Sequence, residues 1–176
     1  MVQERLYYGE IESPFGPLIV VHTKQGVCRI LFGTFEKNES TLNIWIKKNI
    51  GKAELVKDKE TNNPVYIQLI EYFEGQRQSF DLKFDLYGTL FEKKVWQALL
   101  NIGYGKTYSY RELAQVIQSP KAVRAVGCAV NKNPLPIIVP CHRIVGSNGS
   151  LVCYHGGIDK KQMLLEMEYS LEEITS

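Results

Sequence analysis

The segment Pro140-Cys141-His142-Arg143 contains the residue types best suited to chemistry in this chain. A thiolate is a nucleophile, and positive groups beside a cysteine lower the pKa of its thiol and raise the thiolate fraction. A histidine and an arginine follow this cysteine directly, and the apolar run Ile137-Ile138-Val139 before it predicts a strand leading into the segment. We therefore expect Cys141 to be a reactive nucleophile in an electropositive setting.

Other interpretations of the cysteines stay open at this point. A free cysteine often packs as a small apolar residue, and this is what we expect for Cys28 and Cys128, which lie within apolar runs. A cysteine hydrolase would need a base distant in the sequence, for which only His22 and His155 remain besides His142.

A metal site is the third interpretation, because Cys141, His142, Cys153 and His155 lie close together in the sequence. Adjacent residues of an extended segment point to opposite faces, which argues against Cys141 and His142 as joint ligands. The spacing also fits none of the common zinc patterns. We expect no metal and no cofactor.

The stretch from Ser109 to Asn131 has the pattern of a helix-turn-helix. Two short helices are joined by a turn at Gln118-Ser119-Pro120, and the second carries Lys121 and Arg124 on its polar side. This pattern indicates DNA binding, although any pair of short helices with a solvated basic side would look the same.

The elements around these segments divide the chain near Gly88. The pattern predicts a small α/β domain over residues 1–87, with an antiparallel meander, and a helical domain over residues 88–176 that carries all the candidate chemistry. In the first domain we expect strands at Leu6–Ile11, Leu18–Val21, Val27–Phe32, Ala53–Val56 and Phe80–Leu86, and helices around Leu42–Asn49 and Pro64–Phe73. In the second we expect helices opened by capping boxes at Thr89–Glu92 and Ser109–Glu112, a helix over Lys121–Val130 and a last helix from Ile158 to about Glu168.

Composition limits the function classes further. The 176 residues, 44% of them hydrophobic, suffice for a core without disulfides, and the four cysteines form no C-x-x-C pair. A net charge of +2 cannot drive strong non-specific binding to nucleic acid, although a local basic face can bind it. We see neither a signal peptide nor a membrane span, and expect a cytoplasmic protein that does not bind membranes.

The chain from Phe91 to Glu168 closely resembles the O6-alkylguanine-DNA alkyltransferases, and residues 1–87 resemble the N-terminal domain of that family in layout. The matching segments follow in family order and spacing: Val95–Leu99, Gly105–Tyr110, Ser119–Gly127, Asn131–Pro134, Ile138–Val145, Gly156–Lys161 and Leu164–Glu168. The resemblance implies a ribonuclease H-like α/β domain with an antiparallel sheet, followed by a winged helix-turn-helix-like domain.

The resemblance also implies a reaction and its residues. Cys141 would take the alkyl group from O6 of a flipped guanine in duplex DNA, and from O4 of thymine, and the protein would be consumed in one turnover. His142 would be the base that acts through a water, and Glu168 the carboxylate that orients it. Tyr110 would donate a hydrogen bond to the leaving guanine.

Further roles follow from the same resemblance. Arg124 would fill the gap left by the flipped nucleotide while the protein, as a monomer, binds the minor groove. The other residues implied in DNA binding are Lys121, Ala122, Ala125 and Arg143. Those implied in the substrate pocket are Ile144, Val152, Tyr154, His155 and Gly156, and Asn133 would brace the cysteine loop.

This chain departs from the family pattern at two places. His155 stands where a small residue is usual, and Val152-Cys153 replaces a segment that more often contains glycine, so the alkyl groups accepted are left open. Two other functions compete with the alkyltransferase. A lesion-binding relative without activity carries tryptophan at the cysteine position, which Cys141 contradicts, and a transcription regulator would leave the cysteine segment unexplained.

Overall fold

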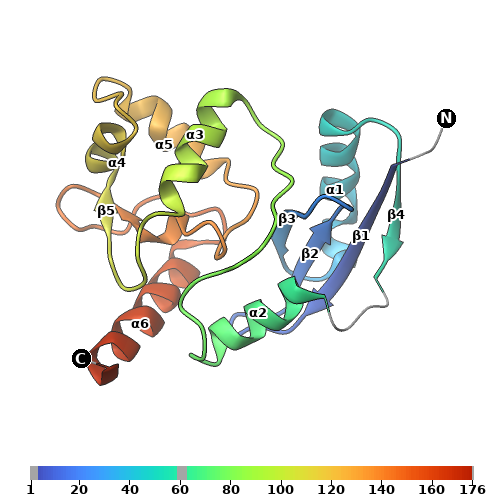
Figure 1. The fold of residues 1–176 in the computed structure, drawn as a ribbon, viewed down its shortest axis with the longest axis horizontal. Helices are drawn as coiled ribbons and strands as arrows, with labels where there is room; N and C mark the ends of the chain where they lie inside the picture. Colours follow the sequence, from blue (N-terminus) through green and yellow to red (C-terminus); the bar gives the residue numbers. More distant parts are fainter. Residues whose placement is uncertain (1–3, 59–62, 176) are drawn as a thin grey trace. The chain divides into compact units, whose positions relative to one another are not determined.

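The strands of the first half form one mixed sheet in the computed structural model, which describes residues 4–58 and 63–175 (Figure 1). The chain forms two compact units, Met1–Tyr87 and Gly88–Ser176. None of the helices within the described residues is long and apolar enough to cross a membrane.

The sheet of the first unit has the order β3-β2-β1-β4. Strands β1 (Glu4–Ile11), β2 (Leu18–His22) and β3 (Val27–Phe32) form the predicted antiparallel meander. Strand β4 (Ala53–Lys57) instead pairs with β1 in parallel, because helix α1 (Phe35–Asn49) crosses over between β3 and β4.

Two helices cover opposite faces of this sheet. Leu42 and Ile46 of α1 pack with Leu6 of β1 in the main core of the unit. On the other face, helix α2 (Pro64–Phe73) brings Tyr66 so close to Gly9 that a Cβ there would lie 2.5 Å from the tyrosine oxygen. Both predicted helices are therefore present. The close approach of Tyr66 leaves no room for a side chain at Gly9, which explains why a glycine stands in this strand.

The predicted strand at Phe80–Leu86 is wrong. Only a single bridge forms there, between Phe84 and Val27 at the edge of the sheet, with Val27 donating its N–H to Lys83 O at 3.0 Å. The side chains alternate as in a strand, but the segment follows β3 for too short a distance to form a ladder.

The second unit is built from helices. Helices α3 (Leu90–Leu99) and α4 (Tyr110–Val116) both begin with the predicted capping boxes, in which Thr89 pairs with Glu92 and Ser109 with Glu112. Helix α5 (Val123–Asn131) lies against α3, where the indole of Trp96 donates a hydrogen bond of 2.9 Å to Ala129 O. The last helix is α6 (Ile158–Thr175).

Helix α5 begins later than predicted, because Pro120 and Lys121 lie in a turn closed by the hydrogen bond from Ala122 N to Ser119 O. Two very short strands complete the unit. In parallel register, β5 (Tyr108–Ser109) and β6 (Ile144–Val145) join the residues before α4 to those after the cysteine segment.

Candidate active site around Cys141

The cysteine segment forms a single turn of 3-10 helix, Cys141–Arg143, and not the end of a strand. The apolar run before it, predicted as a strand, is a buried turn in which Ile137 has a φ of 79°. Asn133 holds this turn by donating its amide to Val139 O at 2.7 Å and by accepting from Leu135 N at 3.0 Å. A buried side chain thus satisfies backbone groups that a sheet would otherwise pair, which is why no strand forms.

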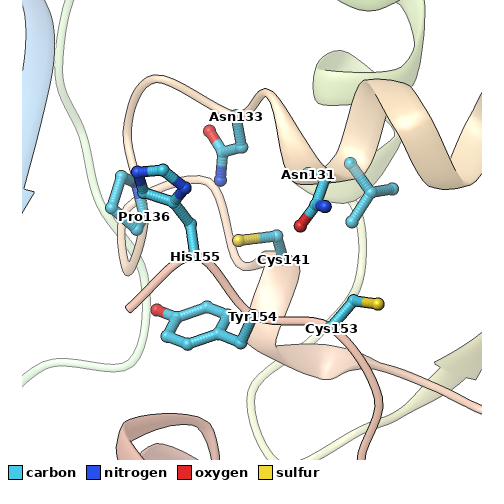
Figure 2. Close-up of a pocket in the computed structure, with 8 residues that line it drawn as sticks. Asn131, Asn133, Pro136, Cys141, Cys153, Tyr154 and His155 are labelled. Carbon is cyan, nitrogen blue, oxygen red and sulfur yellow. The ribbon is translucent and has the colours of Figure 1, made fainter. Parts of the chain in front are cut away.

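The Cys141 thiol is free, is 7% exposed and lines a cavity of about 10 Å³. Figure 2 shows its sulfur pointing toward the space between Asn133 and His155, whereas the sulfur of Cys153 points away from it. The cavity is large enough for one water molecule and too small for a base. Its lining residues are Val130, Asn131, Asn133, Pro136, Cys141, Cys153, Tyr154 and His155.

Behind the cysteine lies a buried network centred on Glu168. Its carboxylate accepts from His142 Nε2 at 2.8 Å and from both Nε and Nη2 of Arg143 at 2.9 Å. It also accepts from the backbone N–H of Gly105 at 3.2 Å. His142 Nδ1 is buried and has no hydrogen-bond partner within the described residues.

The protonation states of Glu168 and His142 follow from their burial and from the groups around them. Burial by itself would raise the pKa of Glu168, but the hydrogen bonds from His142 and Arg143 and the charge of Arg143 outweigh it and hold this pKa well below its usual range. Burial lowers the pKa of His142 despite its bond to Glu168. The arrangement is therefore an ionised Glu168 paired with Arg143, next to a neutral imidazole that donates from Nε2 and keeps the Nδ1 lone pair free to accept a proton.

The structure corrects two expectations about Arg143. It is 5% exposed and pairs with Glu168, so it lies inside the unit and not on a DNA-binding surface. Because that pair is neutral, Arg143 does not make the cysteine electropositive either. Burial raises the pKa of Cys141 to about 11, opposed by a hydrogen bond from Asn133 and by the ammonium of Lys161.

A second and larger hollow, of about 540 Å³, lies beside the first. It is within the size range of small-molecule sites, and Asn131 and Cys153 line both spaces. Tyr110 and Arg124 also line it, which brings these two predicted site residues to one place. Burial raises the pKa of Tyr110 to about 12, so its hydroxyl stays protonated and can donate.

The remaining predicted residues are distributed unevenly. Tyr154 and His155 line the small cavity and Val152 the large hollow, whereas Ile144 and Gly156 line neither of the two. Lys121 and Ala125 are exposed and Ala122 is half-buried, all of them in or just before the first turn of α5. Lys132, the residue that follows α5, forms an ion pair of 2.8 Å with Glu92.

Sequence reasoning missed two features of this site. Cys128, expected to be buried, is exposed and lines the large hollow. Lys161 is fully buried next to the cysteine loop. A lysine in the first turn of a helix is normally expected at the surface, and only its place four residues after Gly157, close behind the pocket segment, could have indicated otherwise.

Comparison with known proteins identifies both units. Residues 6–86 match the family model described as the ribonuclease-like domain of 6-O-methylguanine DNA methyltransferase, and residues 90–170 match the DNA binding domain of the same family. These matches confirm the predicted fold class.

Similar proteins agree over nearly the whole chain. A methylated-DNA–protein-cysteine methyltransferase of Methanosarcina barkeri is 41% identical over 163 residues, which cover 93% of this chain and 97% of that protein. The crystal structure of Mycobacterium tuberculosis O6-methylguanine methyltransferase has a TM-score of 0.78 at 39% identity, covering 94% of this chain and 93% of that one. The structure of Mycobacterium tuberculosis OGT in complex with DNA also has a TM-score of 0.78, at 37% identity, covering 95% and 94%. The resemblance seen in the sequence is thereby confirmed, and the chain belongs to the 6-O-methylguanine DNA methyltransferase family.

Proposed function

We propose that this protein repairs DNA by direct reversal, moving the alkyl group from O6 of guanine to its own Cys141 in a single turnover. The observation that carries the proposal is the free Cys141 thiol at a cavity next to an imidazole whose Nδ1 has no partner among the described residues. Alkylated O4 of thymine fits the same chemistry, because its alkyl carbon is also bonded to an exocyclic oxygen.

The proposed reaction is a displacement at the alkyl carbon. The sulfur of Cys141 forms the new S–C bond as the C–O6 bond breaks, and the electron pair of that bond stays on guanine. The thiol proton passes through a water to Nδ1 of His142, whose Nε2–H remains bonded to Glu168. Tyr110 donates to the departing base, which regains a proton and leaves as guanine. The thioether on Cys141 is stable, so the protein is consumed.

Access to the thiol requires the pocket to open. The cavity of about 10 Å³ cannot hold a base, whereas the adjoining hollow of about 540 Å³ can. We infer that the flipped base enters from the large hollow as the wall formed by residues 152–155 moves outward.

For DNA binding we propose the exposed start of α5, docked in the minor groove. Arg124 lines the hollow through which the base would enter, which suits a side chain that fills the gap in the duplex. Ala122 and Ala125 allow close approach, and Lys121 offers one phosphate contact. We further propose that the protein acts as a cytoplasmic monomer that scans DNA weakly.

The test is a single-turnover transfer assay. Incubated with a duplex that contains O6-methylguanine, the protein should gain one methyl group on the Cys141 peptide and none on the Cys153 peptide, as read by mass spectrometry. Repair should stop at one lesion per molecule. Cys141→Ser should bind the lesion duplex and transfer nothing. Lesion binding without methylation of the wild-type protein would instead indicate a binding protein, and repair of excess substrate would contradict the single-turnover reaction.

A further inference from the structure

Within the part of the chain that the structure describes, the buried ammonium of Lys161 makes a single hydrogen bond. Its side chain lies in the first turn of α6 and is 0% exposed, and its Nζ donates a hydrogen bond of 2.8 Å to Val152 O. Across the described residues, no carboxylate forms an ion pair with it. A buried ammonium without a counterion is costly, so the position needs an explanation.

The other buried charges of the second unit do not supply that counterion. Glu168 is already neutralised by Arg143 through two hydrogen bonds, and His142 is neutral. By contrast, the neighbouring Lys160 has its own acidic partner, Asp159, at 3.7 Å. Lys161 is thus a net positive charge next to the cysteine loop.

The acidic groups that interact with the charge of Lys161 are the thiols of Cys141 and Cys153. Helix α6, which carries Lys161, packs against the turn Cys141–Arg143, and the Lys161 ammonium interacts electrostatically with the buried Cys141 and with the exposed Cys153. Burial lowers the pKa of Lys161 and raises that of Cys141, so each group alone is driven toward its neutral form. Ionised together, the two relieve each other.

We propose that Lys161 is a positioning residue for Cys141: its ammonium is the counterion of the reacting thiolate, and its bond to the Val152 carbonyl holds the pocket wall in place. The inference rests on Cys141 being the nucleophile of the proposed function. It assigns to Lys161 the electropositive influence that the sequence suggested for His142 and Arg143.

Other groups around Cys141 also titrate or carry charge, and the test must separate Lys161 from them. They come from α4, the cysteine segment, the pocket loop and α6: Tyr110, His142, Arg143, Cys153, Tyr154, His155 and Glu168.

The test is the pH profile of Cys141 alkylation by iodoacetamide, followed by mass spectrometry of the Cys141 peptide so that Cys153 does not interfere. Lys161→Gln keeps a hydrogen-bond donor for the wall and removes the charge, while Lys161→Arg keeps the charge. We expect Lys161→Gln to raise the apparent pKa of Cys141 by about one unit, which lowers its rate near pH 7 about tenfold. Lys161→Arg should remain close to wild type.

Lys160→Met is the matched control, because this lysine lies on the same turn of α6 and pairs with Asp159. Its profile should overlay that of the wild type. Overlay of the Lys161→Gln profile as well would overturn the proposal, and so would an equal shift in Lys160→Met. If Lys161→Gln fails to fold, the profile of Lys161→Arg decides, since a shift of one unit with the charge retained contradicts a counterion role. Iodoacetamide needs no DNA, so these outcomes are independent of whether the protein repairs O6-methylguanine.

Discussion

Glu168 is the residue on which most of the buried polar groups at the site depend. It accepts hydrogen bonds from His142, from two nitrogens of Arg143 and from Gly105 N. Removing its charge leaves a buried guanidinium unpaired. We expect Glu168→Gln to lower the free energy of unfolding by about 3 kcal/mol at pH 7, measured by urea denaturation, and to slow alkyl transfer.

The pH dependence of this effect has a definite sign. The pKa of Glu168 is lower in the folded than in the unfolded protein, so its contribution is complete above about pH 4.3 and is lost as the pH falls further. The difference between wild type and Glu168→Gln should therefore shrink below about pH 4. Glu166→Gln, at an exposed position on the same helix, should change stability by less than about 0.5 kcal/mol at every pH. A constant difference down to pH 3 would show that Glu168 is not an ion-pair partner.

At this scale the sequence predicted identities better than environments. Cys141 and His142 stand out as candidates because their types and order are informative. Arg143 was placed on the surface and Lys161 was missed for the same reason: the charge of a side chain can be read from the sequence, but its burial depends on how the cysteine segment and helix α6 pack together. Cys141 lines the small cavity and His142 does not, which agrees with the proposed proton transfer through a water.

At the scale of elements, the start of α4 fixes the position of Tyr110. Ser109 accepts from Glu112 N at 3.1 Å, its own N–H donates to the Glu112 carboxylate at 2.6 Å, and Tyr110 is the first helical residue. The same Ser109 pairs with Val145 in the short β5–β6 ladder. Tyr110 follows β5 directly, and the cysteine segment ends directly before β6. The short β5–β6 ladder therefore holds Tyr110 and the cysteine segment close to one another.

Removing this cap should affect the reaction as well as stability. Ser109→Ala should cost about 1 kcal/mol in urea denaturation and slow single-turnover transfer several-fold, because the helix start that holds Tyr110 frays. Thr89→Ala removes the equivalent cap of α3 and should cost a similar amount while the transfer rate stays unchanged. Equal slowing in both variants would mean that the caps act only through stability.

The elements that the sequence predicted well are those with local signals. Capping boxes, the glycine that follows α1 and the proline that opens α2 all act within a few residues. The two strands that it predicted wrongly, at residues 80–86 and 137–139, have apolar patterns typical of strands. Whether such a pattern forms a ladder depends on the partner, and Asn133 supplies backbone partners by itself in the second case.

At the scale of the whole molecule, two compact units each have a core and one tryptophan. Trp45 lies in the first unit and Trp96 in the second, and the chain has no third. Single-tryptophan variants therefore report on each unit separately. Leu42→Ala, at a fully buried position in the first core, should lower the free energy of unfolding seen by Trp45 by about 3 kcal/mol.

We expect the urea midpoint to shift for only one of the two tryptophans. In the Trp96→Phe background, Leu42→Ala should shift the urea midpoint of Trp45 fluorescence. In the Trp45→Phe background, the midpoint of Trp96 fluorescence should stay in place. A shift of both midpoints by the same amount would show that the two units unfold as a single cooperative body.

The small cavity beside Cys141 has a consequence for how long the protein remains usable. A molecule that reacts only once is lost whenever its sulfur meets a peroxide, a disulfide or a stray electrophile before it meets damage. Because the cavity has room for only about one water, such a reagent can reach the sulfur only when the pocket wall moves. The closed site protects the thiol before repair. The fraction of molecules that still carry an unreacted Cys141 should therefore depend on how seldom the pocket opens in the absence of DNA.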